Sequence, residues 1–200
     1  TYSSQTIPYY SLCVDIDLSN VLNLRKELKE HNVHASVNDF MIKSSARSLQ
    51  EVPEVNTHWM EDQAGDYMMR HYQSDVSFAV STSVGLITPV VRSADRKTLI
   101  QIADESRELI NKARESSLTE EEYSGGTFTI SNLGGFGIRQ FTAIINPPQS
   151  AILAIGSSRS ESNMCTVTLG CDHRVIDGAV GAEWLNSFQK NLETPFLLGI

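Results

Sequence analysis

The chain has 200 residues, of which 40% are hydrophobic and 20% are charged, so it is long enough to bury the core of one globular domain. Its net charge of −8 argues against non-specific binding to nucleic acid, which needs a basic surface, but allows a local basic pocket for an anionic cofactor. No apolar run approaches the roughly 18 residues of a membrane span. The three cysteines form no Cys-x-x-Cys pair, which indicates a reducing compartment and no zinc site. Because the sequence begins with threonine, we expect it to be a processed or excised segment.

The first quarter of the chain predicts a strand followed by two helices. Apolar and polar residues alternate over positions 9–18, as in a half-buried strand, and Ser19 is placed to cap the helix that follows. A second helix is expected to begin at Ser36, with Asp39 three positions later as in a capping box. We expect this helix to end at Val52, because a proline follows.

The rest of the chain mixes short strands with two long amphipathic helices. We expect strands at residues 55–59, 66–72, 76–80, 86–91, 127–131, 141–145, 151–155 and 166–171. Helices are expected over residues 99–113 and 179–192, with a short capped turn at 119–122. Hairpins combined with crossover helices favour an α/β fold in which helices cover a mixed sheet.

The most specific motif lies where the last strand meets the last helix. His173 precedes Asp177 by four positions, and Gly178 follows at once. Taken singly, each residue has a structural explanation: a strand-end histidine, an N-cap aspartate, and a local ion pair between Asp172 and Arg174. The combined spacing His-x-x-x-Asp-Gly at an open junction between two rigid elements is more specific, and it indicates chemistry.

Two glycine-rich stretches flank a strand that carries Ser131 and Asn132. Gly125-Gly126 and the run from Gly134 to Gly137 are not followed by the Lys-Ser/Thr of a phosphate loop and do not match a dinucleotide fingerprint. We therefore interpret these glycines as giving the backbone freedom around Ser131 and Asn132, whose simplest role is turn formation.

The other histidines and the later cysteines have structural interpretations. Neither His58 nor His71 has a partner at metal-ligand spacing. Cys165 and Cys171 are six positions apart in a strand pattern, so we expect them to share one face of the strand as small apolar residues.

The run from Asp172 to Gly178 resembles the motif of the catalytic domain of dihydrolipoamide acyltransferases, the core components of 2-oxo acid dehydrogenase complexes. Further similar blocks are residues 125–134 and 144–149, with weaker matches at residues 36–40 and 85–89. The resemblance extends from about Gln5 to the C-terminus. In detail it is most similar to the pyruvate dehydrogenase branch of eukaryotes, which transfers acetyl groups in the mitochondrial matrix; a bacterial member would be cytoplasmic.

The resemblance implies a fold and an assembly. It implies that residues 1–200 form a single acyltransferase catalytic domain with the chloramphenicol acetyltransferase-like fold, a mixed sheet flanked by helices that is built as a trimer. In this family the trimers assemble into a large hollow core. The implied partners are further copies of the chain, tethered lipoyl domains, and peripheral dehydrogenase subunits that bind through modules outside this segment; neither nucleic acid nor a membrane is implied.

The resemblance also implies the site residues. Carried over by motif, His173 is the general base, Asp177 its structural and electrostatic support, and Ser131 the hydrogen-bond donor to the oxyanion. In the family the histidine comes from one subunit and the serine from its neighbour. Lipoamide is the acyl carrier, no metal is required, and the implied coenzyme A contacts are Arg25, Ser36, Ser131, Asn132 and Gly156.

Two departures and three alternatives accompany the resemblance. The family usually has a basic helix before Gln5, which this chain lacks, and the loop at residues 157–163 is shorter than usual; both concern subunit contacts. The alternatives are a non-catalytic core protein, a free acyltransferase for a small hydroxyl acceptor, and a member specific for branched-chain or succinyl groups. His173, Asp177 and Ser131 argue against the first, and the blocks around Ser131 and at residues 144–149 against the second. The third stays open.

Overall fold

The centre of the protein is a six-stranded mixed sheet with the strand order β1-β10-β9-β8-β4-β7. The computed structural model describes residues 2–83, 85–159 and 161–199. The β9–β8 and β8–β4 pairs are parallel and the remaining pairs antiparallel. The strands of this sheet are β1 (Tyr9–Asp17), β4 (Val76–Phe78), β7 (Val90–Val91), β8 (Phe128–Asn132), β9 (Ala151–Ser158) and β10 (Met164–Asp172).

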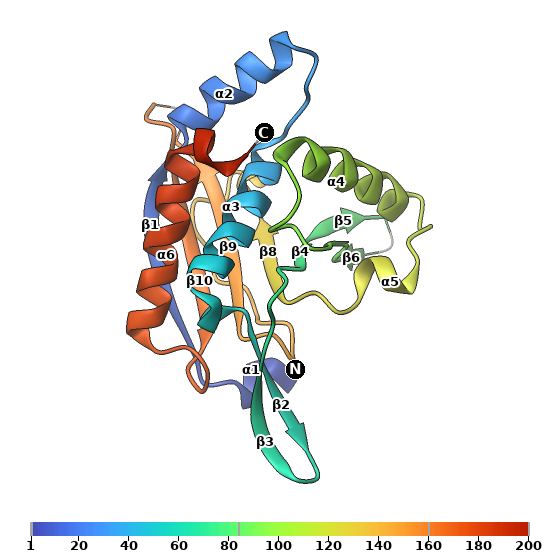
Figure 1. Ribbon diagram of the computed structural model, residues 1–200, viewed down its shortest axis with the longest axis vertical. Coiled ribbons are helices and arrows are strands. Elements are labelled where there is room, and N and C mark those ends of the chain that lie inside the picture. The colour runs from blue at the N-terminus through green and yellow to red at the C-terminus, as the bar shows by residue number, and fades with distance from the viewer. Residues whose placement is uncertain (1, 84, 160, 200) are drawn as a thin grey trace.

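Helices cover the sheet, and two small hairpins lie outside it. In Figure 1, α3 and α6 run side by side across the sheet, α4 lies beyond its β4 side, and the β2–β3 hairpin extends away from the body. The helices are α1 (Tyr2–Thr6), α2 (Ser19–Glu30), α3 (Val37–Glu51), α4 (Leu99–Arg114), α5 (Glu120–Tyr123) and α6 (Gly178–Glu193). Short 3-10 helices are η1 (Pro53–Val55), η2 (Gly134–Phe136) and η3 (Pro195–Leu198). The hairpins are β2 (Thr57–Asp62) with β3 (Gly65–Arg70), and β5 (Val80–Thr82) with β6 (Gly85–Ile87).

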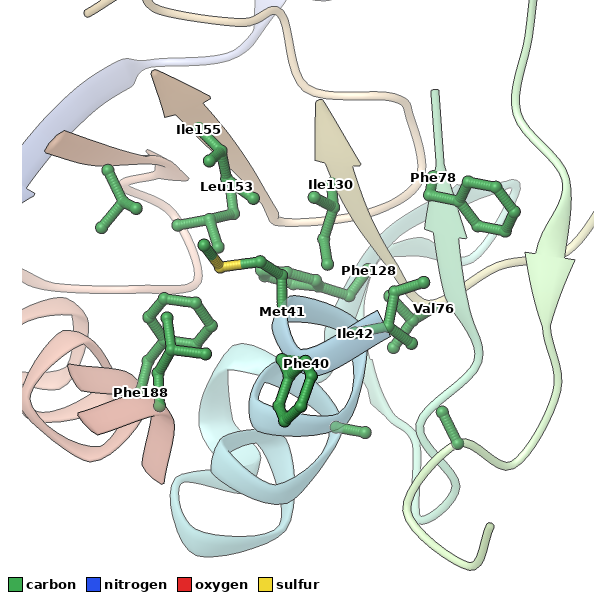
Figure 2. Packing of buried hydrophobic residues seen from close by; sticks show 14 of the residues in the cluster. Phe40, Met41, Ile42, Val76, Phe78, Phe128, Ile130, Leu153, Ile155 and Phe188 are labelled. Carbon is green, nitrogen blue, oxygen red and sulfur yellow. The ribbon is translucent and has the colours of Figure 1, made fainter. Parts of the chain in front are cut away.

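The core lies between α3, α6 and one face of the sheet. Figure 2 shows Met41 of α3 directed toward Leu153 of β9 and Ile42 of α3 beside Val76 of β4, and all four belong to one buried cluster. Each such side chain contributes about 1.5–3 kcal/mol by leaving water. Because α3 is buried over most of its length, it fixes where the sheet strands lie relative to the surface sites at their ends.

Local sequence signals predicted most elements correctly. Ser36 and Asp39 form the expected capping box of α3, and the helix ends with Val52 as its C-cap. The expected helices at 99–113 and 179–192 and the strand at 166–171 are confirmed as α4, α6 and β10, which differ from them only at the ends. Cys165 and Cys171 are both buried in the common core, as predicted.

Three predictions about elements were wrong. Ser19 is the first residue of α2, and the N-cap is Leu18. The Asp17 carboxylate, two positions before Ser19, accepts the Ser19 backbone N–H at 2.8 Å. Residues 141–145 form no strand, because β8 and β9 pair directly with each other and leave no free edge for the segment between them. The expected strands at 76–80 and 86–91 each break into two short strands. Position 160 of the 157–163 loop lies outside the described residues.

Candidate active site

His173 occupies an exposed turn between β10 and α6. Its backbone N–H donates to the Pro8 carbonyl at 3.0 Å, which ties the turn to the segment before β1. The imidazole lies against Tyr10, with ring centroids 4.9 Å apart, and the Tyr10 hydroxyl donates to the Asp177 carbonyl at 2.7 Å. The backbone of His173 is therefore fixed and Tyr10 covers one side of the imidazole, while the exposed part of the ring is accessible from solvent.

A buried ion pair stabilises the turn that carries His173. The fully buried Asp172 carboxylate accepts hydrogen bonds from Arg174 Nε at 3.0 and 3.1 Å and from Arg174 Nη2 at 2.7 Å, which confirms the predicted pair. The Arg174 guanidinium also stacks 4.6 Å above the Trp59 ring, and its Nη1 lies 3.5 Å from Glu61. Because both neighbours of His173 in the sequence are fixed in this way, the turn has little freedom to move.

Asp177 is the N-cap of the last helix. Its carboxylate accepts the Val180 backbone N–H at 2.9 Å, which confirms the predicted cap. Within the described hydrogen bonds, this carboxylate is directed at the helix and has no bond to the imidazole. In one chain Asp177 therefore fixes the start of α6.

Ser131 lies half-buried in β8, far from His173 of the same chain. It pairs in register with Ala154, and Ala154 pairs with Thr168 of β10. His173 is five residues beyond Thr168 and two strands away from Ser131, which places the two α-carbons about 19 Å apart at ~3.3 Å per residue and ~4.8 Å per strand. A single chain therefore does not bring these two predicted site residues together.

Asn132 connects the sheet to α3. Its Nδ2 lies 3.4 Å from the Asn38 Oδ1 in the first turn of α3, and its Oδ1 accepts the Gly134 backbone N–H at 2.8 Å. Gly156 faces the same region from β9, but it is buried beneath the backbone of residues 138–139. A Cβ at this position would lie 2.0 Å from the Arg139 carbonyl oxygen, so only glycine fits there.

A basic cavity of about 650 Å³ lies between α2 and α4. Arg25 and Ser36 line it, as do basic side chains that sequence reasoning missed: Lys26, Lys29, Arg107 and Arg114. Arg25 Nε donates to the Ala35 carbonyl at 3.0 Å, while the Ser36 side chain is engaged with Asp39 in the capping box. The spacing of these basic residues could have indicated the cavity, because positions 25 and 29 lie on one face of α2 and positions 107 and 114 lie on one face of α4.

The cavity and Ser131 are connected through α3. Ser131, Asn132 and Gly156 do not line the cavity. Asn132, however, contacts Asn38, which lies two positions after the cavity residue Ser36. The five predicted cofactor contacts thus form two groups, one in the cavity and one in the sheet, joined at the first turn of α3.

No helix among the described residues is long and apolar enough to cross a membrane. No group of three or more His, Cys, Asp or Glu side chains in this part of the chain is arranged to hold a metal ion.

A family model for the 2-oxoacid dehydrogenases acyltransferase (catalytic domain) matches residues 1–200. Component 2 of the mitochondrial pyruvate dehydrogenase complex dihydrolipoyllysine-residue acetyltransferase of Arabidopsis thaliana is 46% identical over 212 residues, which cover 97% of this chain and 39% of that protein. The acetyltransferase component from Rickettsia bellii is 43% identical over 98% of this chain and 50% of its own length. The chain thus spans two fifths to half of these relatives, and similar proteins are both mitochondrial and bacterial.

Solved structures show the same fold. The Azotobacter vinelandii dihydrolipoamide acetyltransferase, studied for the role of a serine, a histidine and an asparagine in its catalytic mechanism, matches with a TM-score of 0.90 and 30% identity over 98% of this chain and 86% of that one. The cubic core of a pyruvate dehydrogenase multienzyme complex gives the same TM-score. A chloramphenicol acetyltransferase matches at TM-score 0.62 and 18% identity over 94% of this chain and 87% of its own, which confirms the predicted fold.

Proposed function

We propose, since this chain belongs to the family of 2-oxoacid dehydrogenase acyltransferase catalytic domains, that it moves an acetyl group between dihydrolipoamide and coenzyme A. The observation that carries the proposal is the exposed His173 imidazole on a turn fixed by the buried Asp172–Arg174 pair. Such a turn holds a proton acceptor at a constant position while leaving it open to a thiol.

His173 acts as the general base in this proposal. A thiol of ordinary pKa near 8.5 is mostly protonated at neutral pH, and an imidazole can accept its proton as the sulfur attacks the thioester carbonyl of acetyl-dihydrolipoamide. Ser131 donates a hydrogen bond to the oxygen that becomes negative in the tetrahedral intermediate. When the carbon–sulfur bond to dihydrolipoamide breaks, the protonated His173 returns its proton to the departing thiolate. The acetyl group ends on coenzyme A, and no electron transfer is needed.

Asp177 supports the reaction through the helix cap. In the Azotobacter vinelandii enzyme the histidine and the asparagine under study are four positions apart, as His173 and Asp177 are here. Asparagine and aspartate are equally good N-caps, but only aspartate is charged. The property that both side chains share is therefore the ability to fix the start of α6 behind the histidine.

The separation of about 19 Å between Ser131 and His173 supports an active site shared between subunits. We propose a trimer in which His173 of one copy faces Ser131 of its neighbour, and an assembly of trimers into a hollow core. The match to the cubic core of a pyruvate dehydrogenase complex supports this assembly. Lipoamide reaches the site on a tethered lipoyl domain, and the peripheral dehydrogenase subunits bind outside this segment. The compartment is the mitochondrial matrix if the source is a eukaryote and the cytoplasm if it is a bacterium.

The basic cavity between α2 and α4 suits the phosphates of coenzyme A. Its arginines and lysines gather on the surface of a protein with a net charge of −8, which gives an anion a local site that the overall charge does not provide. The pantetheine arm would then pass the first turn of α3 toward Ser131 and Asn132.

A matched pair of variants tests this cavity. Lys29→Gln removes one cavity cation and should raise the KM for coenzyme A about tenfold, equivalent to ~1.4 kcal/mol, with kcat unchanged. Arg96→Gln removes an exposed cation that does not line the cavity and should change neither constant. Equal effects of both variants would mean that only overall charge matters.

An acetyl-transfer assay with dihydrolipoamide and acetyl-CoA, combined with particle sizing, tests the function as a whole. We expect acetyl transfer by a particle much larger than a trimer. A large particle without transfer would identify a non-catalytic core protein, and an active lone trimer that prefers a small hydroxyl acceptor would identify a free acyltransferase. Faster transfer from branched-chain or succinyl thioesters would assign the chain to another branch of the family.

A further inference from the structure

One face of the β2–β3 hairpin gathers two histidines and two methionines. His58 pairs directly with Met69, so their side chains lie on the same face. Met60 is two positions after His58, and His71 is two positions after Met69, which places them on that face as well. All four side chains line one cavity of about 450 Å³ between the hairpin and the start of β8. We call these four residues the His-Met cluster.

The two imidazoles of the cluster have nitrogen atoms without partners. His58 is only 5% exposed, and its ring centroid lies 4.0 Å from that of His71. The Nε2 atoms of both rings are buried and have no hydrogen-bond partner among the described residues. Leaving a buried polar atom unpaired costs about 1–3 kcal/mol, so two such atoms beside one cavity mark a place where a ligand can bind.

The surroundings of both rings disfavour the charged form. Burial, and then the neighbouring His71, lower the pKa of His58 to about 4. Burial also lowers the pKa of His71, although the charge of Asp75 acts in the opposite direction. The Gly126 backbone accepts a hydrogen bond from the His58 ring, which leaves the Nε2 lone pair of His58 free. A histidine that donates its other N–H to a carbonyl is the usual arrangement for a metal ligand.

We propose that the His-Met cluster binds one soft monovalent metal ion of the copper(I) type. Imidazole nitrogens and thioether sulfurs are the donors that copper(I) prefers, whereas magnesium and calcium prefer carboxylate and carbonyl oxygens. The ring centroids of His58 and His71 lie 4.0 Å apart, so both imidazoles border the same small volume of the cavity. Met69 is 37% exposed, which gives the ion an access path from solvent.

The hairpin itself provides a matched control. Met68 pairs with Trp59, so it lies on the opposite face of the same strand and is 59% exposed. Replacing either methionine by leucine keeps the side-chain volume and removes the sulfur. Only Met69→Leu should therefore affect a site on the cluster face. The exposed thiol of Cys13 would bind copper(I) by itself, so every variant should also carry Cys13→Ser.

The test is an anaerobic titration of the assembled protein with copper(I) against a chromophoric copper(I) chelator. We expect one ion per chain, at least tenfold weaker binding in Met69→Leu and in His71→Gln, and unchanged binding in Met68→Leu. Silver(I), which is not reduced or oxidised under these conditions, should raise the unfolding temperature of the parent protein and of Met68→Leu but not of His71→Gln.

Two results would overturn the site. One is the absence of stoichiometric binding, which would mean that ordered water fills the cavity and satisfies the two nitrogens. The other is equal binding by Met69→Leu and Met68→Leu. The unfolding temperature of each variant without metal shows whether it is folded, and Met69→Leu changes a side chain that is more than a third exposed. Acetyl transfer is not the readout: His173→Ala should bind the ion normally, so the metal site and the proposed function can fail separately.

Discussion

His173 and His58 show one type of side chain in two different environments. His173 is exposed on a turn at the end of β10, with the Tyr10 ring beside it. His58 is buried on a hairpin against His71, where its pKa falls to about 4. An exposed imidazole can gain and lose a proton in every turnover, whereas a buried neutral one keeps a lone pair for a ligand.

The supports of the two histidines differ in the same way. The backbone around His173 is held by the Asp172–Arg174 pair and by the cap of α6, so the turn is fixed while the ring is left open. At His58 the ring itself is enclosed, and the strand that carries it belongs to a two-stranded hairpin outside the main sheet. Variants at the two positions should therefore affect different properties, and four experiments test this separation.

The largest expected effect is that of His173→Ala on acetyl transfer. Loss of the proposed general base should lower kcat by up to about 10⁴-fold, while the size of the particle stays unchanged. His58→Gln is the comparison and should stay within about twofold of the parent. Steady-state assays of both variants give the answer, and full turnover by His173→Ala would remove this histidine from the mechanism.

Ser131→Ala should come second, with kcat lowered about 10²–10³-fold and KM changed much less. The reason is that the hydrogen bond to the oxyanion is stronger in the transition state than in the bound substrate. Separate determination of kcat and KM tests this. An unchanged kcat would exclude Ser131 as the oxyanion donor and would leave His173 without its proposed partner.

Arg174→Met should come third and should act through the turn rather than through the chemistry. It leaves the buried Asp172 carboxylate without its cation, which should destabilise the protein by about 3 kcal/mol. Asp172→Asn together with Arg174→Met removes both charges and should recover part of that loss. Thermal unfolding of the single and double variants tests the pair, and additive effects would mean that the two residues are not coupled.

The smallest effect is the contribution of His58 to the pH dependence of stability. Its folded pKa of about 4 lies below the ordinary value of 6.5, so the unfolded chain binds the proton first as the pH falls. This contribution is fully present above pH 6.5 and is lost toward pH 4, with about 2 kcal/mol lost between pH 7 and pH 5. Unfolding temperatures at the two pH values should differ less in His58→Gln than in the parent. An identical difference would show that His58 is not kept neutral.

Features that depend on a few neighbouring residues were predictable. The Ser36–Asp39 capping box, the Asp177 cap and the Asp172–Arg174 pair each depend on residues within three positions of one another. The start of α2 shows that one neighbouring side chain can shift a predicted helix boundary. The Asp17 carboxylate accepts the Ser19 N–H, and the N-cap is Leu18, one residue earlier than predicted. The segment 141–145 has a strand-like alternation, but a strand also needs a free neighbour, and no local pattern reports that.

Features that join distant segments were not predicted. The basic cavity brings α2 to α4 across about 80 positions, and no spacing rule links Lys29 to Arg107. The contact between His58 and His71 depends on the register of the β2–β3 hairpin. The expected strands at 55–59 and 66–72 were close enough to suggest a hairpin, so pairing them by residue would have placed both histidines on one face.

The distance between Ser131 and His173 within one chain has a consequence for mixed assemblies. Subunits carrying His173→Ala and subunits carrying Ser131→Ala would each lack one half of the proposed shared site, so neither should form an active particle alone. Unfolded together and reassembled in equal amounts, they should complement each other. In a cyclic trimer about one quarter of the junctions would combine an intact histidine with an intact serine, and about that fraction of parental activity should return.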